Sequence, residues 1–316
     1  MSEREHHPPG YPLRPALVRA PDSRFGEQVF VCLGGRRHLV IDAGRLDAYG
    51  IAWPRDLVHV SPEFLESLRP AQFLPRRWTA AERARPPSGL TSRDLREIAA
   101  AHLTGLGLEV GALASPYPAP IDCQVLYGDI LSHAELVAEY TNEPRDNMVI
   151  PTIRTSFETL TEFSPASLDF ILASHVIEHT RDPIGAVVNA LAKLRDGGTL
   201  VLVIPDKRRT FDRDRPVTPL EHLIADFRDP SHERDADDHR EFHRLAFPRP
   251  DADYEAVWRH SWNTRRPIHY HTWVYDSFME MIRWIAGNAA SCRGIWSHPT
   301  LHREVDDFEF YVTLTK

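Results

Sequence analysis

Residues 167–183 read SLDFILASHVIEHTRDP, and residues 191–206 read LAKLRDGGTLVLVIPD. Each stretch holds an apolar run long enough for a buried strand, and the chain between the two runs has the character of a helix that ends at Gly197 and Gly198. Apolar strands that alternate with helices are typical of a parallel sheet covered on both faces. Because crossovers between parallel strands are right-handed, these stretches predict an α/β fold with a doubly wound, mostly parallel sheet.

The alternation continues on both sides of these two stretches. Shorter apolar runs predict strands upstream, and an alternating aromatic and β-branched run predicts a closing strand near the end. The charged, proline-rich residues 207–268 interrupt the pattern and are interpreted as an insertion. Helices are predicted at residues 92–106 with Ser92 as the cap, at 133–140 and at 273–289, and strands at 107–112, 123–130, within 147–156, and at 308–315.

The composition is that of an ordinary globular protein and argues against several kinds of partner. Of the 316 residues, 42% are hydrophobic and 26% are charged, and the net charge of −8 provides no broad basic surface for nucleic acid. No run of about 18 apolar residues exists, so no membrane partner is expected. The N-terminal residues lack the apolar core of a signal peptide. The cysteines, Cys32, Cys123 and Cys292, lack the spacing of a disulfide framework, and we therefore expect a cytoplasmic protein.

The N-terminal part of the chain predicts a small accessory unit. Residues 1–26 are rich in proline, histidine and charge, and are interpreted as a loose arm. Residues 27–90 are interpreted as a β-rich module with its linker, containing a hairpin and a helix capped by Ser61. Residues 91–316 are expected to form the main domain, in which the insertion at 207–268 acts as a lid over the substrate.

The residues that follow the predicted strands are the candidates for a ligand site. In an open parallel sheet, ligands bind beyond the carboxyl ends of the strands, near the point where the strand order reverses. The residues at these ends are Glu109, Gly111 and Ala112 for the first strand, Asp129 for the second, Ser156 and Phe157 for the third, Ser174 and His175 for the fourth, and Asp206 for the fifth.

Four of these segments resemble a known family. LEVGA, VLYGDI, SLDFILASHVIEHTRDP and LAKLRDGGTLVLVIPD resemble the successive motifs of class I S-adenosylmethionine-dependent methyltransferases, most closely the small-molecule group. The resemblance covers about residues 92–206 and, less closely, 270–316. It implies a seven-stranded Rossmann-like sheet, S-adenosylmethionine as cofactor, and a small-molecule acceptor. The implied reaction is methyl transfer to an oxygen or nitrogen of a small polar molecule, such as a sugar or natural-product intermediate in a bacterial pathway.

The same resemblance implies which residues hold the cofactor. A glycine after the first strand lets the backbone approach the methionine portion closely, and Asp129 stands where a carboxylate accepts both ribose hydroxyls. Family members usually carry further glycines here, whereas GALASPYP keeps only Gly111. The implied set is Glu109 at the amino group, Gly111 and Ala112 at the methionine portion, Asp129 at the ribose, Ser156 and Phe157 at the adenine, and Ser174 at the end of the fourth strand.

The histidines after the fourth strand allow two interpretations. His175 and His179 flank Glu178 in the order His-x-x-Glu-His, which is also the order of an inverted zinc-peptidase motif. That motif needs a helix and a third ligand, but here a strand ends just before His175, and Asp182-Pro183 follow closely. The stretch therefore predicts a strand-to-helix turn. The resemblance places His175 beside the transferable methyl group, where it acts as a general base or only shapes the turn.

Other candidates lie at the fifth strand, in the insertion and after it. His269 and His271 alternate in an extended segment, so both could face one pocket and accept a proton. Asp206 either orients the acceptor or pairs with a neighbouring basic residue. His239 and His243 lie four residues apart near several acids and are the candidates for a divalent metal. The alternative for this run is a solvated face, and no resident metal is expected.

The N-terminal module has a resemblance of its own. Residues 34–65 resemble a small module of some bacterial polysaccharide and surface proteins, with Trp53 at one tryptophan position and Leu39 in place of the other. About fifty residues bury little surface alone. The module is therefore expected to dock on the main domain, to cover the cleft or to mediate a homodimer.

Two further functions stay open beside methyl transfer. The loss of glycines and the many histidines motivate a second hypothesis, a methyltransferase-like fold that performs other chemistry in natural-product biosynthesis, such as cyclisation, elimination or a metal-assisted reaction. The other alternative is a non-catalytic partner in such a pathway.

Overall fold

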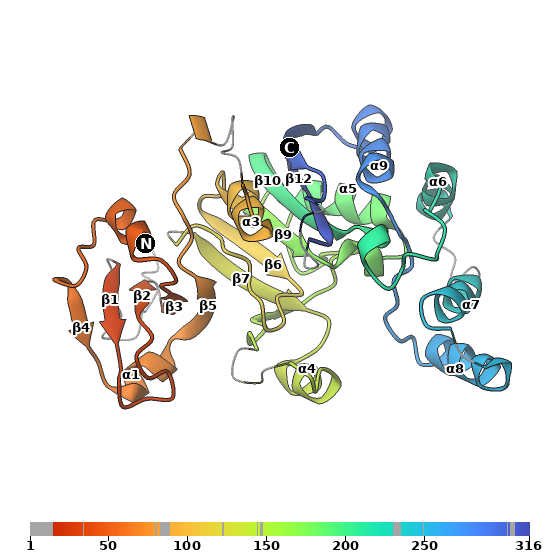
Figure 1. The fold of residues 1–316 in the computed structure, drawn as a ribbon. Helices are drawn as coiled ribbons and strands as arrows, with labels where there is room; N and C mark the ends of the chain where they lie inside the picture. The colour runs from red at the N-terminus through yellow and green to blue at the C-terminus, as the bar shows by residue number, and fades with distance from the viewer. Residues whose placement is uncertain are drawn as a thin grey trace.

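The computed structural model shows two β-sheets, with helices around the larger one (Figure 1). It describes residues 15–33, 35–79, 81–82, 89–121, 123–143, 145, 148–229, 235–248, 250–301, 303 and 307–316. Residues 1–14 of the predicted arm and residues 83–88 of the predicted linker lie outside the described residues. Within the described part of the chain, no helix is long and apolar enough to cross a membrane.

The larger sheet has seven strands in the order β11-β12-β10-β9-β6-β7-β8. The strands β10, β9, β6, β7 and β8 run parallel, whereas β12 is antiparallel to both of its neighbours. The doubly wound, mostly parallel α/β sheet expected from the sequence is therefore confirmed. The strands are β6 (Leu106–Val110), β7 (Gln124–Asp129), β8 (Ile153–Arg154), β9 (Leu168–Ser174), β10 (Leu194–Pro205), β11 (Arg293–His298) and β12 (Glu309–Thr315).

The strand order reverses at β6. The chain passes from β6 to β7 and β8 on one side, and then places β9, β10 and β12 on the other side of β6. The carboxyl ends of β6 and β9 therefore flank the crevice in which an open α/β sheet binds its ligand. Val110 and Ser174 are the last residues of these strands, so the turns after them form the rim of the crevice.

Helices cover both faces of the larger sheet (Figure 1). Successive side chains of β9 point to opposite faces, as the pleat of a strand requires. Phe170 and Leu172 pack in the core that contains α3, whereas Ile171 and Ala173 pack in the core on the other side. This two-sided burial explains the continuous apolar sequence of β9. The covering helices are α3 (Ser92–Ala100) on one face, and α5 (Pro183–Lys193), α6 (Leu220–Arg228) and α9 (Tyr275–Asn288) on the other.

Several predicted helix boundaries are wrong. α3 ends at Ala100, well before the predicted end at residue 106, where β6 already begins. Thr91, and not Ser92, caps α3, because the Thr91 hydroxyl accepts the N–H of Asp94, and the Asp94 carboxylate accepts the Thr91 N–H in return. α5 ends at Lys193, ahead of Gly197, because the next residue already pairs with the first residue of β9. The predicted helix at 133–140 is confirmed as α4 (His133–Glu139).

The smaller sheet has five strands in the order β4-β1-β2-β3-β5. The predicted loose arm is wrong for β1, which pairs with both β2 and β4. Leu17 and Val18 are buried in cores on opposite faces of this sheet, a short apolar pair that the polar composition of the arm concealed. The predicted hairpin (β2 and β3) and the helix capped by Ser61 are confirmed. The elements are β1 (Ala16–Arg19), β2 (Phe30–Leu33), β3 (Arg36–Leu39), β4 (Leu57–His59), α1 (Pro62–Ser67) and β5 (Arg69–Phe73).

Buried polar contacts fix the smaller sheet to the larger unit. The guanidinium of Arg36 donates to the carbonyls of Ile121 and Cys123 at 3.3 and 2.5 Å. Arg45 pairs with Glu97 of α3 at 2.6 Å, and the carboxylate of Glu97 is fully buried. The accessory unit is therefore docked on the unit that carries the crevice, which was one of the three arrangements expected for it.

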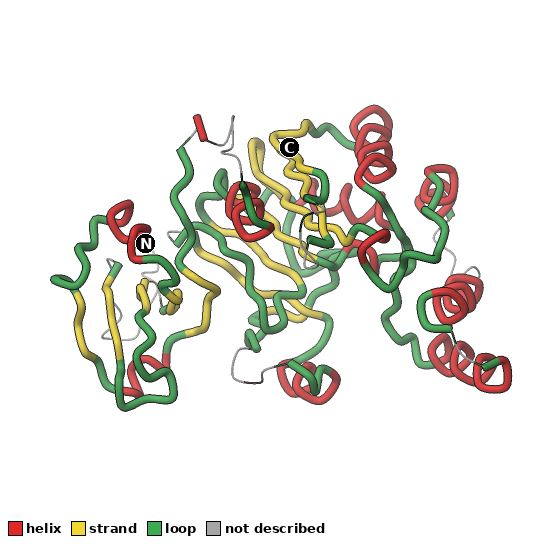
Figure 2. Tube along the Cα trace, in the orientation of Figure 1, coloured by secondary structure: helices red, strands yellow, loops and turns green. Residues whose placement is uncertain are grey.

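The described residues between 207 and 268 fold mainly into helices (Figure 2). α7 (Asp235–Leu245) and α8 (Asp251–Asn263) pack against each other. The rings of Phe211, Phe242 and Phe247 cluster together, and Phe211 also contacts the ring of His269 with centroids 4.7 Å apart. The insertion is thus a helical layer whose cluster of phenylalanine rings contacts the segment just before α9.

Candidate active site

The turn that follows β9 lies at the rim of the crevice. His175 has a left-handed backbone (φ 56°), which a residue other than glycine adopts only when its surroundings impose it. Its N–H donates to the carbonyl of Val203 in β10 at 2.9 Å. A 3-10 helix follows over only three residues, Ile177–His179, and Asp182 then caps α5. Since no α-helix carries the two histidines, the turn cannot present them as a peptidase motif does.

A buried ion-pair network holds the imidazole of His175. Its Nε2 lies 2.8 Å from Oε2 of Glu309, the first residue of β12. Glu309 also accepts two hydrogen bonds from the guanidinium of Arg96 at 2.7 and 2.6 Å, and one from the hydroxyl of Tyr311 at 2.7 Å. Because the fork of Arg96 binds both oxygens of this carboxylate, the orientation of Glu309, and with it the ring of His175, is fixed.

The network also keeps the carboxylate of Glu309 ionised. Burial by itself raises the pKa of Glu309, but the charge of Arg96 and the hydrogen bond from His175 outweigh burial and bring that pKa far below its usual value. An ionised carboxylate only accepts hydrogen bonds, so Nε2 of His175 donates to Glu309, and Nδ1 is the nitrogen that the network leaves for a ligand. Nδ1 lies 3.7 Å from Oε1 of Glu178, and the side chain is 27% exposed. One nitrogen is therefore anchored and the other can accept a proton.

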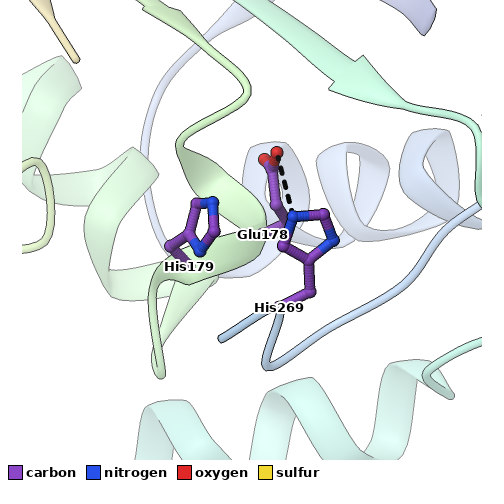
Figure 3. A group of neighbouring side chains, drawn as sticks. All are labelled: Glu178, His179 and His269. Atoms are coloured by element: carbon purple, nitrogen blue, oxygen red, sulfur yellow. Dashed lines mark ion pairs between the residues drawn. The ribbon is translucent and has the colours of Figure 1, made fainter. Parts of the chain in front are cut away.

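A second cluster of side chains lies beside the same turn (Figure 3). Glu178 and His179 project from the 3-10 helix, and His269 reaches them from the segment before α9. Oε1 of Glu178 lies 4.0 Å from Nε2 of His269, whose Nδ1 lies 2.6 Å from a carboxylate oxygen of Asp212. Glu178 is 1% exposed, and neither of its carboxylate oxygens accepts a hydrogen bond from a described residue. The cluster thus combines a buried acid with two imidazoles.

His269 and His271 do not face one pocket, contrary to the expectation. The N–H groups of Tyr270 and His271 both donate to the carbonyl of Glu178, at 2.8 and 3.4 Å, which a flat strand does not allow. The segment therefore bends, and Nε2 of His271 donates to the carbonyl of Arg181 at 3.0 Å instead. Burial lowers the pKa of His271 to about 4, so its ring stays neutral. Its buried position does not suit proton transfer with a ligand in the crevice.

Asp206 is fully buried and fully engaged. It accepts hydrogen bonds from the backbone N–H and the guanidinium of Arg208, and from the hydroxyl of Thr300 at 2.8 Å. Burial acts to raise the pKa of Asp206, but the hydrogen bonds from Arg208 and Thr300 outweigh it and lower the pKa. This is the ion-pair alternative of the two considered for Asp206.

Two predicted cofactor residues lie at the carboxyl ends of β6 and β7. Asp129 is partly buried, its Oδ1 accepts the N–H of Leu131 at 2.9 Å, and burial raises its pKa. Gly111 has a φ of 70°, and its N–H donates to the carbonyl of Gly128 at 3.0 Å. A Cβ at Gly111 would lie 2.8 Å from Cγ2 of Val176, so glycine allows the turns after β6 and β9 to approach each other.

Glu109 holds the loop that follows Gly111. Its Oε1 accepts the N–H of Tyr117 at 2.7 Å, and burial raises its pKa to about 8. Its Oε2 has no hydrogen-bond partner among the described residues. Ala112 is buried against Tyr127 and Val149. This glycine-poor loop is therefore folded down on the sheet, and a hydrogen bond to Glu109 fixes its course.

The other predicted cofactor residues line the same edge in different ways. The hydroxyl of Ser156 accepts the N–H of Glu158 at 3.2 Å. The ring of Phe157 is buried in the main core, so its backbone is the part left for a ligand. Ser174 is partly buried at the end of β9.

His239 and His243 on α7 join no metal-type cluster among the described residues. Nδ1 of His239 lies 3.0 Å from the hydroxyl of Ser261, and burial lowers the pKa of His239 to about 4. His243 stacks edge-on against the ring of Phe242, with centroids 5.2 Å apart. Two other sets of three side chains have ligand atoms within 4.8 Å of one another: Glu178, His179 and His269, and His222, Asp226 and His271.

Sequence reasoning missed Glu309, Arg96 and Asp212. Glu309 is the one charged residue in the apolar strand FEFYVTLT, and this signal could have identified it. Arg96 lies in a helix with several other charged residues, and Asp212 lies in a charged run, so no sequence signal distinguishes either of them.

The sequence matches one family model. Residues 131–289 match a model described as a methyltransferase domain. The match covers half of the chain, and it includes the turn after β9, the insertion and α9. No curated protein sequence matches the chain significantly.

Solved structures with a similar course of the chain share little sequence with it. A structure described as a putative zinc-dependent alcohol dehydrogenase from Rhodobacter sphaeroides is 12% identical, covering 72% of this chain and 91% of that chain, with a TM-score of 0.43. An S-adenosylmethionine-dependent methyltransferase from Mesorhizobium loti is 11% identical (72% and 99% covered, TM-score 0.40). The N-methyltransferase NodS from Bradyrhizobium japonicum, in complex with S-adenosylhomocysteine, is 12% identical (71% and 85% covered, TM-score 0.37).

Proposed function

The chain belongs to the methyltransferase-domain family, and from this premise we propose that it transfers a methyl group from S-adenosylmethionine to an oxygen of a small polar molecule. A nitrogen acceptor is the variant of the same proposal, and a sugar or a natural-product intermediate is the proposed class of acceptor. The observation that carries the proposal is His175, which stands at the ligand-binding edge of the sheet with Nε2 anchored on Glu309 and Nδ1 able to accept a proton.

The residues at the carboxyl ends of β6 and β7 fit this cofactor. Asp129 is partly exposed at the end of β7, where its carboxylate would accept the ribose hydroxyls. Gly111 brings the turns after β6 and β9 together, and the unpaired Oε2 of Glu109 would meet the amino end of the methionine portion. Ser156, the backbone of Phe157 and Ser174 complete the proposed set. The folded-down loop after Gly111 supplies shape where other family members have glycines.

The proposed chemistry needs few groups. The cofactor supplies a methyl group on a positively charged sulfur, which is a reactive electrophile. The protein holds the acceptor in line with it, and most of the rate comes from this proximity. Nδ1 of His175 accepts the proton of the acceptor hydroxyl, and Glu309 stabilises the imidazolium that forms, as the carboxylate of a hydrolytic triad does. Arg96 keeps Glu309 ionised throughout.

The insertion offers a place for the acceptor. A cavity of about 620 Å³ lies between α7, α8 and the segment before α9. Its wall is mainly apolar, with a few polar groups, as small-molecule sites usually are. The residues that line it include Phe242, Phe247, Val257, His260, Arg266 and Ile268.

Some broader features belong to the same proposal. We propose the docked smaller sheet, with its linker to residue 90, as an accessory domain and residues 91–316 as the catalytic domain. The three free thiols suit a reducing cytoplasm. A homodimer is the proposed oligomer, and light scattering of the purified chain would test it.

Titration calorimetry tests the proposed function directly. We expect micromolar binding of both S-adenosylmethionine and S-adenosylhomocysteine, and loss of both on Asp129→Ala. Asp196→Ala, which changes an exposed acid in β10, is the matched control and should bind as the wild type does. Failure of the wild-type chain to bind either compound would overturn the proposal, and unchanged binding by Asp129→Ala would remove the ribose assignment.

A second function keeps one specific observation in its favour. The unsatisfied Glu178 cluster suits metal-assisted chemistry on a natural product in the same crevice. A non-catalytic pathway partner stays as the remaining alternative, and no described side-chain cluster favours it. Detection of a methylated product would separate both from the leading proposal.

A further inference from the structure

The cluster of Glu178, His179 and His269 contains a buried acid whose side chain is left unsatisfied. Glu178 is 1% exposed and accepts no side-chain hydrogen bond from the described residues. A buried carboxyl group whose oxygens accept no hydrogen bond carries an uncompensated desolvation cost of about 1–3 kcal/mol or more. Unsatisfied buried groups in native proteins call for an explanation, and an absent ion is one of the usual ones. The proposed methyl transfer at His175 does not use Glu178 and therefore does not explain its unsatisfied carboxyl group.

We infer that Glu178, His179 and His269 bind a divalent transition-metal ion of the zinc class, through one carboxylate oxygen and two imidazole nitrogens. The ligand atoms of these three side chains lie within 4.8 Å of one another (Figure 3).

The tautomers of both histidines suit metal binding. Nδ1 of His179 lies 2.9 Å from the carbonyl oxygen of Ile268, which can only accept, so Nδ1 carries the proton and Nε2 keeps its lone pair. Nδ1 of His269 lies 2.6 Å from Asp212, which leaves Nε2 of His269 free on the side of Glu178.

The partners of His269 resemble those of a metal-ligating histidine. Such histidines usually donate their second N–H to a carboxylate, which fixes the ring and raises its basicity. Asp212 does this here and is itself held by the buried Arg215 at 2.9 Å. Arg215 also donates to the carbonyls of His269 and Tyr270 at 2.8 and 3.3 Å, so one guanidinium holds both the carboxylate and the backbone of the ligand.

The ligand atoms need to approach one another to bind one ion. With metal–ligand bonds of about 2.1 Å, ligand atoms around a tetrahedral zinc lie about 3.4 Å apart. The 4.0 Å between Oε1 of Glu178 and Nε2 of His269 would therefore shorten by about 0.6 Å, and the other two pairs, which lie within 4.8 Å, by at most about 1.4 Å, within reach of side-chain rotation.

The donor set selects the class of ion. Two imidazoles and one carboxylate suit zinc and its transition-metal neighbours, whereas calcium and magnesium prefer oxygen ligands. Three protein ligands also leave one position open, as catalytic zinc sites do. In a step that rests on the proposed function, this position takes the acceptor oxygen, because Glu178 lies 3.7 Å from Nδ1 of His175, the proposed base.

The second metal-type set in the described residues is less suited to a metal. Nε2 of His222 already pairs with Asp226 at 3.1 Å, and Nε2 of His271 donates to a backbone carbonyl. In the first set, by contrast, neither oxygen of Glu178 accepts a hydrogen bond from a described residue, and the nearest imidazole nitrogens, of His175 and His269, lie 3.7 and 4.0 Å from Oε1. His222→Ala is therefore the matched control, because it removes a partly buried histidine from a similar cluster.

The test uses the full chain without a histidine tag, stripped with a chelator and titrated with Zn²⁺. Bound zinc is counted by mass spectrometry after gel filtration, and Co²⁺ in its place reports the ligand field by visible absorption. We expect one ion per chain in the wild type and in His222→Ala. Glu178→Gln and His269→Ala should bind at least about 100-fold more weakly, and Asp212→Asn about 10- to 100-fold more weakly.

Each other outcome overturns the inference. Absence of zinc binding in the wild type, full binding by Glu178→Gln and His269→Ala together, or loss of the ion in His222→Ala would each do so. Circular dichroism shows whether each variant is folded, and Glu178→Gln, which keeps the shape of the side chain, guards against a folding defect. S-adenosylhomocysteine binding is measured on the metal-free chain, so a failure of the proposed function is seen separately from a failure of the metal site.

Discussion

Glu309 and Glu178 are two buried carboxylates beside one imidazole, and the protein treats them in opposite ways. Glu309 lies 2.8 Å from Nε2 of His175, and Glu178 lies 3.7 Å from Nδ1 of the same ring. Glu309 accepts hydrogen bonds from Arg96, Tyr311 and His175, whereas the side chain of Glu178 accepts none from the described residues. Their side chains are equally hidden, at 3% and 1% exposure.

The difference separates a supporting group from a group that awaits a ligand. A fully bonded carboxylate adds rigidity and orients whatever it holds, so Glu309 is a positioning residue for His175. An unsatisfied carboxylate stores a desolvation cost that a bound cation removes. Glu309 and Glu178 are buried to the same extent, so only the number of their hydrogen bonds distinguishes them.

Removal of the His175 imidazole, which lies between Glu309 and Glu178, should give the largest effect on the rate. If Nδ1 of His175 is the base, His175→Gln lowers kcat by about 10²- to 10⁴-fold, because that is what a positioned general base contributes. The rate of S-adenosylhomocysteine formation with an accepted substrate measures this, beside calorimetric binding of S-adenosylhomocysteine, which should not change. His59→Gln in the smaller sheet is the control and should keep the wild-type rate. A rate within threefold of wild type for His175→Gln would leave the residue with a structural role only.

Loss of the fully hydrogen-bonded carboxylate of Glu309 should give the largest change in stability. Glu309→Ala leaves the guanidinium of Arg96 without its partner in a mostly buried position, and we expect a loss of about 3–5 kcal/mol in the free energy of unfolding. Urea unfolding followed by circular dichroism measures this value. The double variant Arg96→Met with Glu309→Met should recover part of it, because it removes both charges. A loss below about 1 kcal/mol for Glu309→Ala would mean that the network adds little to the fold.

Acid should reduce the contribution of Glu309 to the free energy of unfolding in a specific range of pH. The pKa of Glu309 in the folded chain is depressed, so its contribution to stability is complete above its unfolded pKa of about 4.3 and is lost as the pH falls toward the folded value. Each pH unit in that range removes about 1.4 kcal/mol for this one proton. The stability of the wild type should therefore fall more steeply below pH 4.3 than that of Glu309→Gln. Equal slopes in urea titrations at pH 3 and 4 would contradict the depressed pKa.

The unsatisfied carboxylate should respond in the opposite direction. In metal-free protein, Glu178→Gln removes a buried charge that has no described hydrogen-bond partner, and we expect a gain of about 1 kcal/mol in the free energy of unfolding. Added Zn²⁺ should stabilise the wild type and leave this variant unchanged, because only a chain that binds the ion gains from it. Thermal unfolding with and without the ion measures both effects. A destabilised Glu178→Gln would indicate that the carboxylate has a structural partner.

The sequence predicts the sheet far better than it predicts these two carboxylates. Continuous apolar runs fixed the parallel strands, because burial on both faces leaves a one-dimensional signal. The position of His175 at the end of β9 followed from the same pattern. The pairing of Glu309 with Arg96 did not, because they lie more than two hundred residues apart in sequence, and their contact depends on how β12 lies against α3.

The other errors have the same origin. His269 and His271 were expected on one side because they alternate, but both backbone N–H groups at 270 and 271 turn to a single carbonyl. β1 was hidden because its four residues sit beside a long polar stretch. In each case the structure depends on a tertiary contact, which the local sequence does not reveal.

The smallest expected effect comes from an ion pair that differs from Arg96 and Glu309 in its exposure. Arg266 lies 3.0 Å from Glu139 of α4, and the two side chains are 61% and 49% exposed. Water and salt screen such a pair, so Arg266→Ala should cost less than about 1 kcal/mol, and the cost should fall in 1 M salt. The cost of Glu309→Ala should depend less on salt, because buried pairs are screened less. Urea unfolding of both variants at low and high salt measures the contrast. A similar salt dependence in the two would mean that water reaches Glu309, and its role in orienting His175 would then lose its physical basis.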